Sequence, residues 1–279
     1  MTDERGCLIA IGGHEDKKGE RVILKAVAER IRAGRLVIAT VASHEPEGYF
    51  DAYREAFTGI GVTDLAELYL DEREETLDPA HRELIAGAAG IFFTGGDQLR
   101  IVSQMGDTPL ETLVRELYAR GGVVAGTSAG ASAQSETMLV RGSGAESHRI
   151  GDLHMAPGLG LLPDVIIDQH FAERGRIGRL LGAVAHNPRL LGIGIDEDSA
   201  IVVENGCFSV IGSGAVTVVD AASATHSNIA EAEPDRTLSL HHVVLHALSE
   251  GDGFDLASRH PVAAPVRTDR PADEQAGGD

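Results

Sequence analysis

Short apolar runs alternate along the chain with longer stretches in which apolar residues recur at helical spacing. The first run, Cys7–Ile11, is continuous and precedes a glycine pair, and the apolar positions of Glu20–Ala33 fit one face of a helix. Continuous runs are typical of strands that a parallel sheet buries on both faces. The alternation predicts an α/β fold, a three-layer sandwich with a mostly parallel central sheet. We expect strands at Cys7–Ile11, Arg35–Val41, Asp64–Leu70, Gly90–Thr94, before Gly126, Leu161–Asp168 and Leu190–Ile195, and helices at Glu20–Ala33, Tyr49–Phe57, from Asp78-Pro79, Leu110–Ala119 and Arg174–Ala185.

The pattern changes after Ser199. Short β runs, with Asn205-Gly206 as a hairpin turn, predict an antiparallel extension near the C-terminus. We expect an irregular loop at Met138–Pro157, which would cover a functional site at the carboxyl ends of the strands, and a last helix at Leu238–Leu248. Residues 1–250 are then a single α/β domain, and 251–279, rich in Pro, Asp, Arg and Gly, are an acidic disordered tail.

The stretch Gly126-Thr127-Ser128-Ala129-Gly130 carries the clearest chemical signal. It follows an apolar strand and has the G-x-S-x-G pattern of a nucleophile elbow, in which a sharp turn projects the serine hydroxyl clear of the sheet. The N–H of Ala129 would face a developing oxyanion. The same glycine-rich turn also suits a segment that only packs or that binds a phosphate.

A serine nucleophile needs a base and a group that orients the base. Of the twelve histidines, His170 directly follows a predicted strand, so it should share the carboxyl edge of the sheet with Ser128. The next strand ends at Asp196-Glu197-Asp198, and spacing does not choose among these three acids. The order serine, histidine, acid differs from that of the common α/β-hydrolases. Two other histidines, His148 and His154, are candidate substrate contacts near the glycine-rich loop.

Composition narrows the class of partner. The net charge of −19 opposes nucleic-acid binding. It suits a cationic substrate, but compositional bias and adaptation to high salt are competing explanations. No apolar run approaches the ~20 residues of a membrane span, and Cys7 and Cys207 lie in predicted strands, which opposes a disulfide framework. We expect a cytoplasmic protein with no membrane partner.

Five segments together resemble the cyanophycinases, serine exopeptidases of the S51 peptidase family. The elbow alone is shared with the aspartyl dipeptidases of that family, whereas the set is more specific. The segments, in chain order, are Gly12–Lys17, Thr94–Gln98, Gly126–Ala131, Asp168–Phe171 with the arginines at 174, 176 and 179, and Gly194–Glu197. His14 is a departure, because a small residue is expected there.

The resemblance implies a class I glutamine amidotransferase-like sandwich, with Ser128 as nucleophile, His170 as general base and Glu197 as orienting acid. It implies an oxyanion hole from the backbone N–H groups of Gly96 and Ala129, and a homodimer as the working form. The chemistry calls for no metal or organic cofactor. The family substrate is cyanophycin, a poly-aspartate with arginine amide-linked to each β-carboxyl, and the product is the β-Asp-Arg dipeptide.

The resemblance also implies a substrate-binding set. The arginines at 174, 176 and 179 could form bidentate hydrogen bonds with carboxylates of the polymer, or they could form a solvent-exposed helix face. Asp168 could hold a substrate arginine, and the loop Gly142–His154 is where specificity should vary. Two alternatives remain open, an α-aspartyl or isoaspartyl dipeptidase of the same family and a non-catalytic ligand-binding relative. The implied contacts are Gln98, Asp168, Gln169, Arg174, Arg176 and Arg179.

Overall fold

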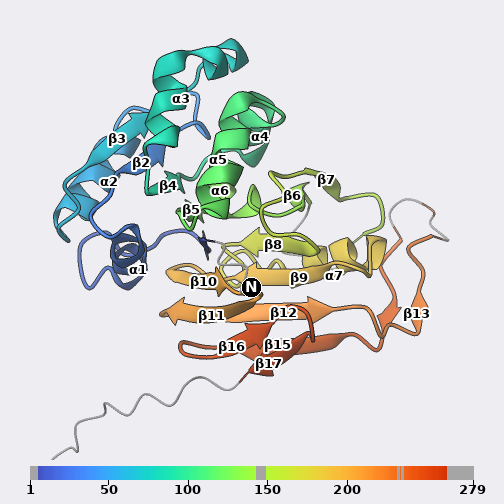
Figure 1. Ribbon diagram of the computed structural model, residues 1–279. Coiled ribbons are helices and arrows are strands. Elements are labelled where there is room, and N and C mark those ends of the chain that lie inside the picture. The colour runs from blue at the N-terminus through green and yellow to red at the C-terminus, as the bar shows by residue number, and fades with distance from the viewer. Residues whose placement is uncertain (1–5, 143–148, 231–232, 234–235, 263–279) are drawn as a thin grey trace, which may run out of the picture.

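The computed structural model describes residues 6–142, 149–230, 233 and 236–262. Two sheets organise them, and in Figure 1 the helices of the first half lie mostly above the strands of the second half. The larger, nine-stranded sheet has the order β17-β16-β11-β10-β1-β5-β4-β2-β3. Its strands are β1 (Cys7–Ile11), β2 (Leu36–Ala39), β3 (Leu65–Leu68), β4 (Gly90–Phe93), β5 (Val123–Thr127), β10 (Ser199–Glu204), β11 (Cys207–Gly212), β16 (Gly253–Asp255) and β17 (His260–Val262).

This sheet is mixed. Strands β1, β5, β4, β2 and β3 pair in parallel, whereas β10, β11, β16 and β17 continue from β1 in antiparallel pairs. The parallel strands are joined by helices, as parallel connections require. The α/β class and the antiparallel extension are confirmed. The helices are α1 (Val22–Ile31), α2 (Tyr49–Thr58), α3 (Pro79–Ala86), α4 (Gln98–Met105), α5 (Pro109–Ala119), α6 (Ala129–Ser132) and α7 (Ile177–His186), with a 3₁₀ turn at Arg73–Leu77.

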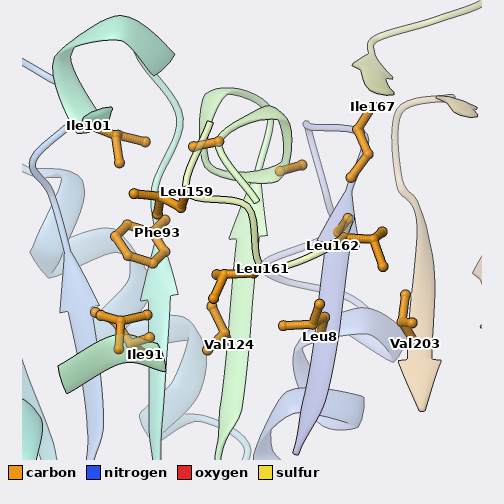
Figure 2. Packing of buried hydrophobic residues seen from close by; sticks show 14 of the residues in the cluster. Leu8, Ile91, Phe93, Ile101, Val124, Leu159, Leu161, Leu162, Ile167 and Val203 are labelled. Carbon is orange, nitrogen blue, oxygen red and sulfur yellow. The ribbon is translucent and has the colours of Figure 1, made fainter. Parts of the chain in front are cut away.

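Alternating side chains of the large sheet enter two cores. On one face, Ile9 and Ile11 pack with Leu24 and Val27 of α1. On the other face, residues of β1, β4, β5 and β10 meet the segment 159–162, which lies across them, and Figure 2 shows Leu8, Val124 and Leu161 in this packing. Residues of α4 and α5 also enter this second core, so helices cover both faces of the parallel half.

A second sheet was not foreseen. The strands expected at 161–168 and 190–195 form a separate four-stranded sheet of order β15-β12-β9-β8. Ile167 of β8 points into the core shared with the large sheet, and Ile166 points to Leu180 of α7 on the outer face. The strands are β8 (Val165–Gln169), β9 (Leu191–Ile195), β12 (Val216–Asp220) and β15 (Val244–Leu248).

Three predictions about the later segments need correction. The helix expected at Leu238–Leu248 is wrong, because β14 (Leu240–His241) pairs with β13 (His226–Ser227) and β15 pairs with β12. The irregular loop contains the strand pair β6 (Thr137–Arg141) and β7 (His154–Pro157), while 143–148, with His148, lie outside the described residues. The disordered tail is wrong for 253–262, which form β16 and β17; 263–279 lie outside the described residues. No helix in the described part of the chain combines the length and apolarity that crossing a membrane requires.

Candidate active site

Ser128 stands at the sharp turn between β5 and α6. Its backbone has φ +53° and ψ −110°, a sparsely populated conformation for a residue with a β-carbon. The turn is held by hydrogen bonds from the Ser128 N–H to the Ile11 carbonyl (2.9 Å) and from the Ser132 N–H to the Ser128 carbonyl (3.1 Å). The hydroxyl therefore projects from the carboxyl edge of the sheet, as the elbow pattern predicts.

The flanking glycines are required by close packing. A β-carbon on Gly126 would lie 2.4 Å from the Gly130 carbonyl oxygen, and one on Gly130 would lie 2.4 Å from the Phe93 carbonyl oxygen. Both distances are shorter than any real contact. The glycines thus let α6 fold back against β5 and β4, which fixes the direction of Ser128.

His170 and Glu197 complete a hydrogen-bonded chain with the serine. Ser128 Oγ lies 2.9 Å from His170 Nε2, and His170 Nδ1 lies 2.7 Å from Glu197 Oε1. The His170 residue is 4% exposed, and the Glu197 side chain keeps 25% of its surface in solvent. The geometry is that of a nucleophile, a base and an orienting carboxylate.

The surroundings shift the pKa of both titratable partners. Burial lowers the pKa of His170 below its usual 6.5, against the bond to Glu197, which raises it. Burial raises the pKa of Glu197, but hydrogen bonds from His14 and His170 outweigh it, so the pKa of the carboxyl is lowered. A neutral imidazole beside an ionised carboxylate is the resting state that a general base needs.

The other two acids of the β9–β10 turn, Asp196 and Asp198, accept hydrogen bonds from backbone N–H groups. Asp196 accepts the N–H groups of Ala172 (3.0 Å) and Ala215 (3.1 Å), and Asp198 accepts the N–H of Asp16 (2.8 Å). Sequence spacing left three candidates, and the structure brings only Glu197 to the imidazole.

Two N–H groups expected to form an oxyanion hole lie next to the serine in the structure or the sequence. A β-carbon on Gly95 would lie 3.5 Å from Ser128 Cβ, so the turn that carries Gly96 approaches Ser128. Gly96 has φ +144°, and a β-carbon there would lie 2.4 Å from the Ala42 carbonyl oxygen. Among the described residues, the N–H groups of Gly96 and Ala129 donate no hydrogen bond. Both N–H groups are therefore available to donate a hydrogen bond to an anion.

Asp168 is the centre of a buried cluster and is fully enclosed. Its Oδ2 accepts from Arg179 Nε (2.6 Å), and its Oδ1 accepts from Arg176 Nη1 (3.2 Å), Arg179 Nη2 and the Gln169 N–H (2.9 Å). This does not fit the expectation that Asp168 holds a substrate arginine. Its carboxylate orients two guanidinium groups, and the trio keeps a surplus of positive charge even though burial lowers the pKa of Arg176 to about 10.

The remaining predicted contacts differ in exposure. Gln98 is buried, and its Nε2 donates to the Leu139 carbonyl (2.7 Å). Gln169 is buried, and its Oε1 accepts from Arg176 (2.7 Å). Arg174 is exposed and close enough to His170 to lower the pKa of the imidazole. Of the set, Arg174 alone is exposed to solvent.

Two functional neighbours were missed by sequence reasoning, His14 and Glu15. Glu15 is 3% exposed and accepts from Thr127 Oγ1 (2.6 Å), Tyr53 Oη (2.5 Å) and Lys17 Nζ (2.9 Å), so it ties the loop after β1 to the residue before the nucleophile. Both residues follow the buried strand β1 after the pair Gly12-Gly13. The strand-end reasoning that selected His170 would also have selected them.

Among the described residues, His14, His170 and Glu197 bring possible metal-ligand atoms within 4.8 Å of one another. His14 Nδ1 lies 2.7 Å from Glu197 Oε2 and His170 Nδ1 lies 2.7 Å from Glu197 Oε1, so each oxygen of the carboxylate contacts one imidazole.

Known proteins resemble this chain over most of its length. The family model of peptidase family S51 matches residues 8–211. A cyanophycinase of Trichormus variabilis is 40% identical over 265 residues, covering 93% of this chain and 89% of that protein. One of Geminocystis herdmanii is 38% identical over 266 residues, covering 94% and 98%.

Solved structures support the fold. The crystal structure of a peptidase from an acI-B1 Actinobacterium superposes with a TM-score of 0.61 at 23% identity, covering 86% of this chain and 96% of that one. A putative peptidase E protein from Listeria monocytogenes gives a TM-score of 0.53 at 17% identity, covering 75% and 100%.

Proposed function

Because the chain belongs to peptidase family S51 and is a serine-type peptidase, we propose that it is an exopeptidase that hydrolyses cyanophycin to β-Asp-Arg dipeptides. The observation that carries the proposal is the unbroken chain from Ser128 Oγ through the His170 imidazole to Glu197. The similarity to cyanophycinases over most of both chains supports the substrate. We place the enzyme in the cytoplasm as a homodimer, as the resemblance implies.

In the proposed mechanism, Ser128 Oγ attacks the carbonyl carbon of an aspartyl backbone amide while His170 Nε2 takes the hydroxyl proton. Glu197 accepts the Nδ1–H of His170 and stabilises the imidazolium that forms. The N–H groups of Gly96 and Ala129 donate to the tetrahedral oxyanion, each contributing roughly 3 kcal/mol.

The imidazolium then gives its proton to the leaving amine, and an ester joins Ser128 to the substrate acyl group. Water attacks this ester with His170 again acting as the base, which frees the acyl fragment as a carboxylate and restores the hydroxyl. Every proton is passed by the one imidazole. The low pKa of His170 suits this role, since the base must be neutral at the start of both halves.

Substrate recognition is assigned to the positive cluster beside the base. Each arginine carried by the polymer keeps a free α-carboxylate, and the surplus charge of Arg176, Arg179 and Asp168, together with the exposed Arg174, is complementary to these groups. The net charge of −19 over the whole chain would favour approach of the arginine side chains of the polymer. Gln98 and Gln169 shape the wall of this region through their buried bonds.

Mass spectrometry of the products tests the proposal. The protein is incubated with cyanophycin granules and, separately, with α- and isoaspartyl dipeptides, beside the Ser128→Ala variant as a blank. The expected product from cyanophycin is β-Asp-Arg, absent from the blank. Cleavage of the dipeptides alone would assign the chain to the dipeptidase branch of the family instead.

A further inference from the structure

His14 lies on the solvent side of the catalytic groups, in the loop after β1. Its Nδ1 is 2.7 Å from Glu197 Oε2, and the other oxygen of that carboxylate, Oε1, is 2.7 Å from His170 Nδ1. The two imidazole rings also meet edge to face, with centroids 5.1 Å apart. Each oxygen of the Glu197 carboxylate therefore contacts one imidazole nitrogen.

This position is built into the loop. His14 has φ +50°, a conformation that a residue with a β-carbon holds only where its surroundings enforce it. The Gly13 carbonyl accepts the Asp198 N–H (2.8 Å), and the Asp16 N–H donates to Asp198 Oδ1 (2.8 Å). Although the His14 side chain is 73% exposed, its backbone is fixed to the turn that carries Glu197.

We propose that His14 is a positioning residue of the triad, which holds the second oxygen of Glu197 and shares the charge of that carboxylate with His170. The inference rests on the proposed roles of His170 and Glu197. A carboxylate bonded on one oxygen only can rotate away from the imidazole, whereas a donor on each oxygen fixes its plane. A carboxylate that also interacts with His14 is a weaker acceptor for His170. The pKa of His170 therefore stays lower, and its imidazole remains neutral at lower pH.

The electrostatics agree with this assignment. After burial, the hydrogen bond from His14 is the first of the influences that lower the pKa of Glu197. Burial, Arg174 and a charge on His14 all lower the pKa of His170. Within the ranges that the structure describes, seven other charged residues lie near His14, His170 and Glu197, and none of them donates a side-chain hydrogen bond to the Glu197 carboxylate. Three are near the Glu197 backbone (Asp196, Asp198 and Glu173), one is four residues after His170 (Arg174), and three are in the His14 loop (Glu15, Asp16 and Lys17).

Kinetics of two variants give the first test. His14→Ala should lower kcat about tenfold, because Glu197 loses a charge-assisted hydrogen bond, and should move the acid limb of the pH profile to higher pH. His14→Asn keeps an amide donor near the place of Nδ1 and should restore most of kcat. The matched control is His81→Ala, which removes a partly exposed histidine bonded to the Glu75 carbonyl and should leave both readouts unchanged.

NMR titration of ¹³C-labelled histidine gives the second test without any substrate. The His170 resonance, identified by its loss in His170→Asn, should titrate at higher pH in His14→Ala than in the wild-type protein. If the wild-type protein fails to cleave cyanophycin, the proposed function falls while this titration still decides the role of His14. An unchanged His170 titration in His14→Ala, or a rise in KM alone, would overturn the proposal.

Discussion

Ser128 Oγ and His170 Nε2 lie 2.9 Å apart although their strands belong to different sheets. The end of β1 joins them, because the Ile11 carbonyl accepts the Ser128 N–H (2.9 Å) and the Gly12 carbonyl accepts the His170 N–H (2.8 Å). Successive carbonyls at the end of one strand thus bind the backbone N–H groups of Ser128 and His170. Gly13 keeps this approach open, since a β-carbon there would lie 2.3 Å from His170 Cε1.

Replacing Glu197 by Gln should reduce kcat roughly 10³-fold or more, because an amide fails to fix the Nδ1–H tautomer and to stabilise the imidazolium. The fold should persist, since the side chain is partly exposed. Steady-state kinetics on cyanophycin beside a thermal melt measure both. A kcat within about tenfold of the wild type would remove Glu197 from the catalytic machinery.

The pH profile should show an acid limb below pH 6.5. Burial lowers the pKa of His170 from 6.5, so the imidazole stays neutral and able to accept a proton below that pH. The same shift predicts that folding stability falls as pH drops through 6.5, because the unfolded chain binds that proton more tightly than the folded chain. Measuring kcat/KM from pH 4 to 9 gives the limb of the free enzyme; an acid limb above 6.5 would contradict the account.

Asp168→Asn should destabilise the protein by about 3 kcal/mol, because it leaves Arg176 and Arg179 buried without an anion. Urea unfolding measures the loss. The matched control is Asp164→Asn, which breaks an exposed pair with Arg189 at 3.5 Å and should cost less than about 1 kcal/mol. Equal losses in the two variants would show that the buried cluster has no special role in stability.

Gly130→Ala should cost about 1–3 kcal/mol and most of the activity, because its β-carbon would overlap the Phe93 carbonyl and push α6 away from β4. Gly87→Ala, where the added carbon meets only the Glu83 carbonyl at 3.4 Å, serves as the control. Thermal melts and turnover of both variants decide the point. A Gly130→Ala enzyme of normal stability and rate would refute the packing argument for the elbow.

The sequence predicts the alternating strands and helices of the parallel half well, because continuous apolar runs and glycine turns are local signals. The cap at Asp78, which accepts the Ala80 N–H, is one such signal that the structure confirms. Strand β15 was mistaken for a helix because short apolar runs fit both periods, and pairing with β12 decides the matter. Helix α4 was not predicted, because it begins at the end of the glycine-rich segment Thr94–Gln98, in which Asp97 is the N-cap.

The candidate site also contains residues that the sequence predicts and contacts that it does not. Ser128 and His170 could be found because each directly follows an apolar strand. Nothing in the sequence indicates that β8 and β9 leave the large sheet, or that Asp168 is enclosed by two arginines, because both depend on contacts between distant segments. His14 could not be paired with Glu197 for the same reason.

The most direct test of the central claim, that Ser128 at the end of β5 is the nucleophile, is the rate of β-Asp-Arg release from cyanophycin by the Ser128→Ala variant. The account predicts a fall of roughly 10⁴-fold or more, with an unchanged circular dichroism spectrum and melting temperature. Release at a rate close to that of the wild-type protein would contradict it.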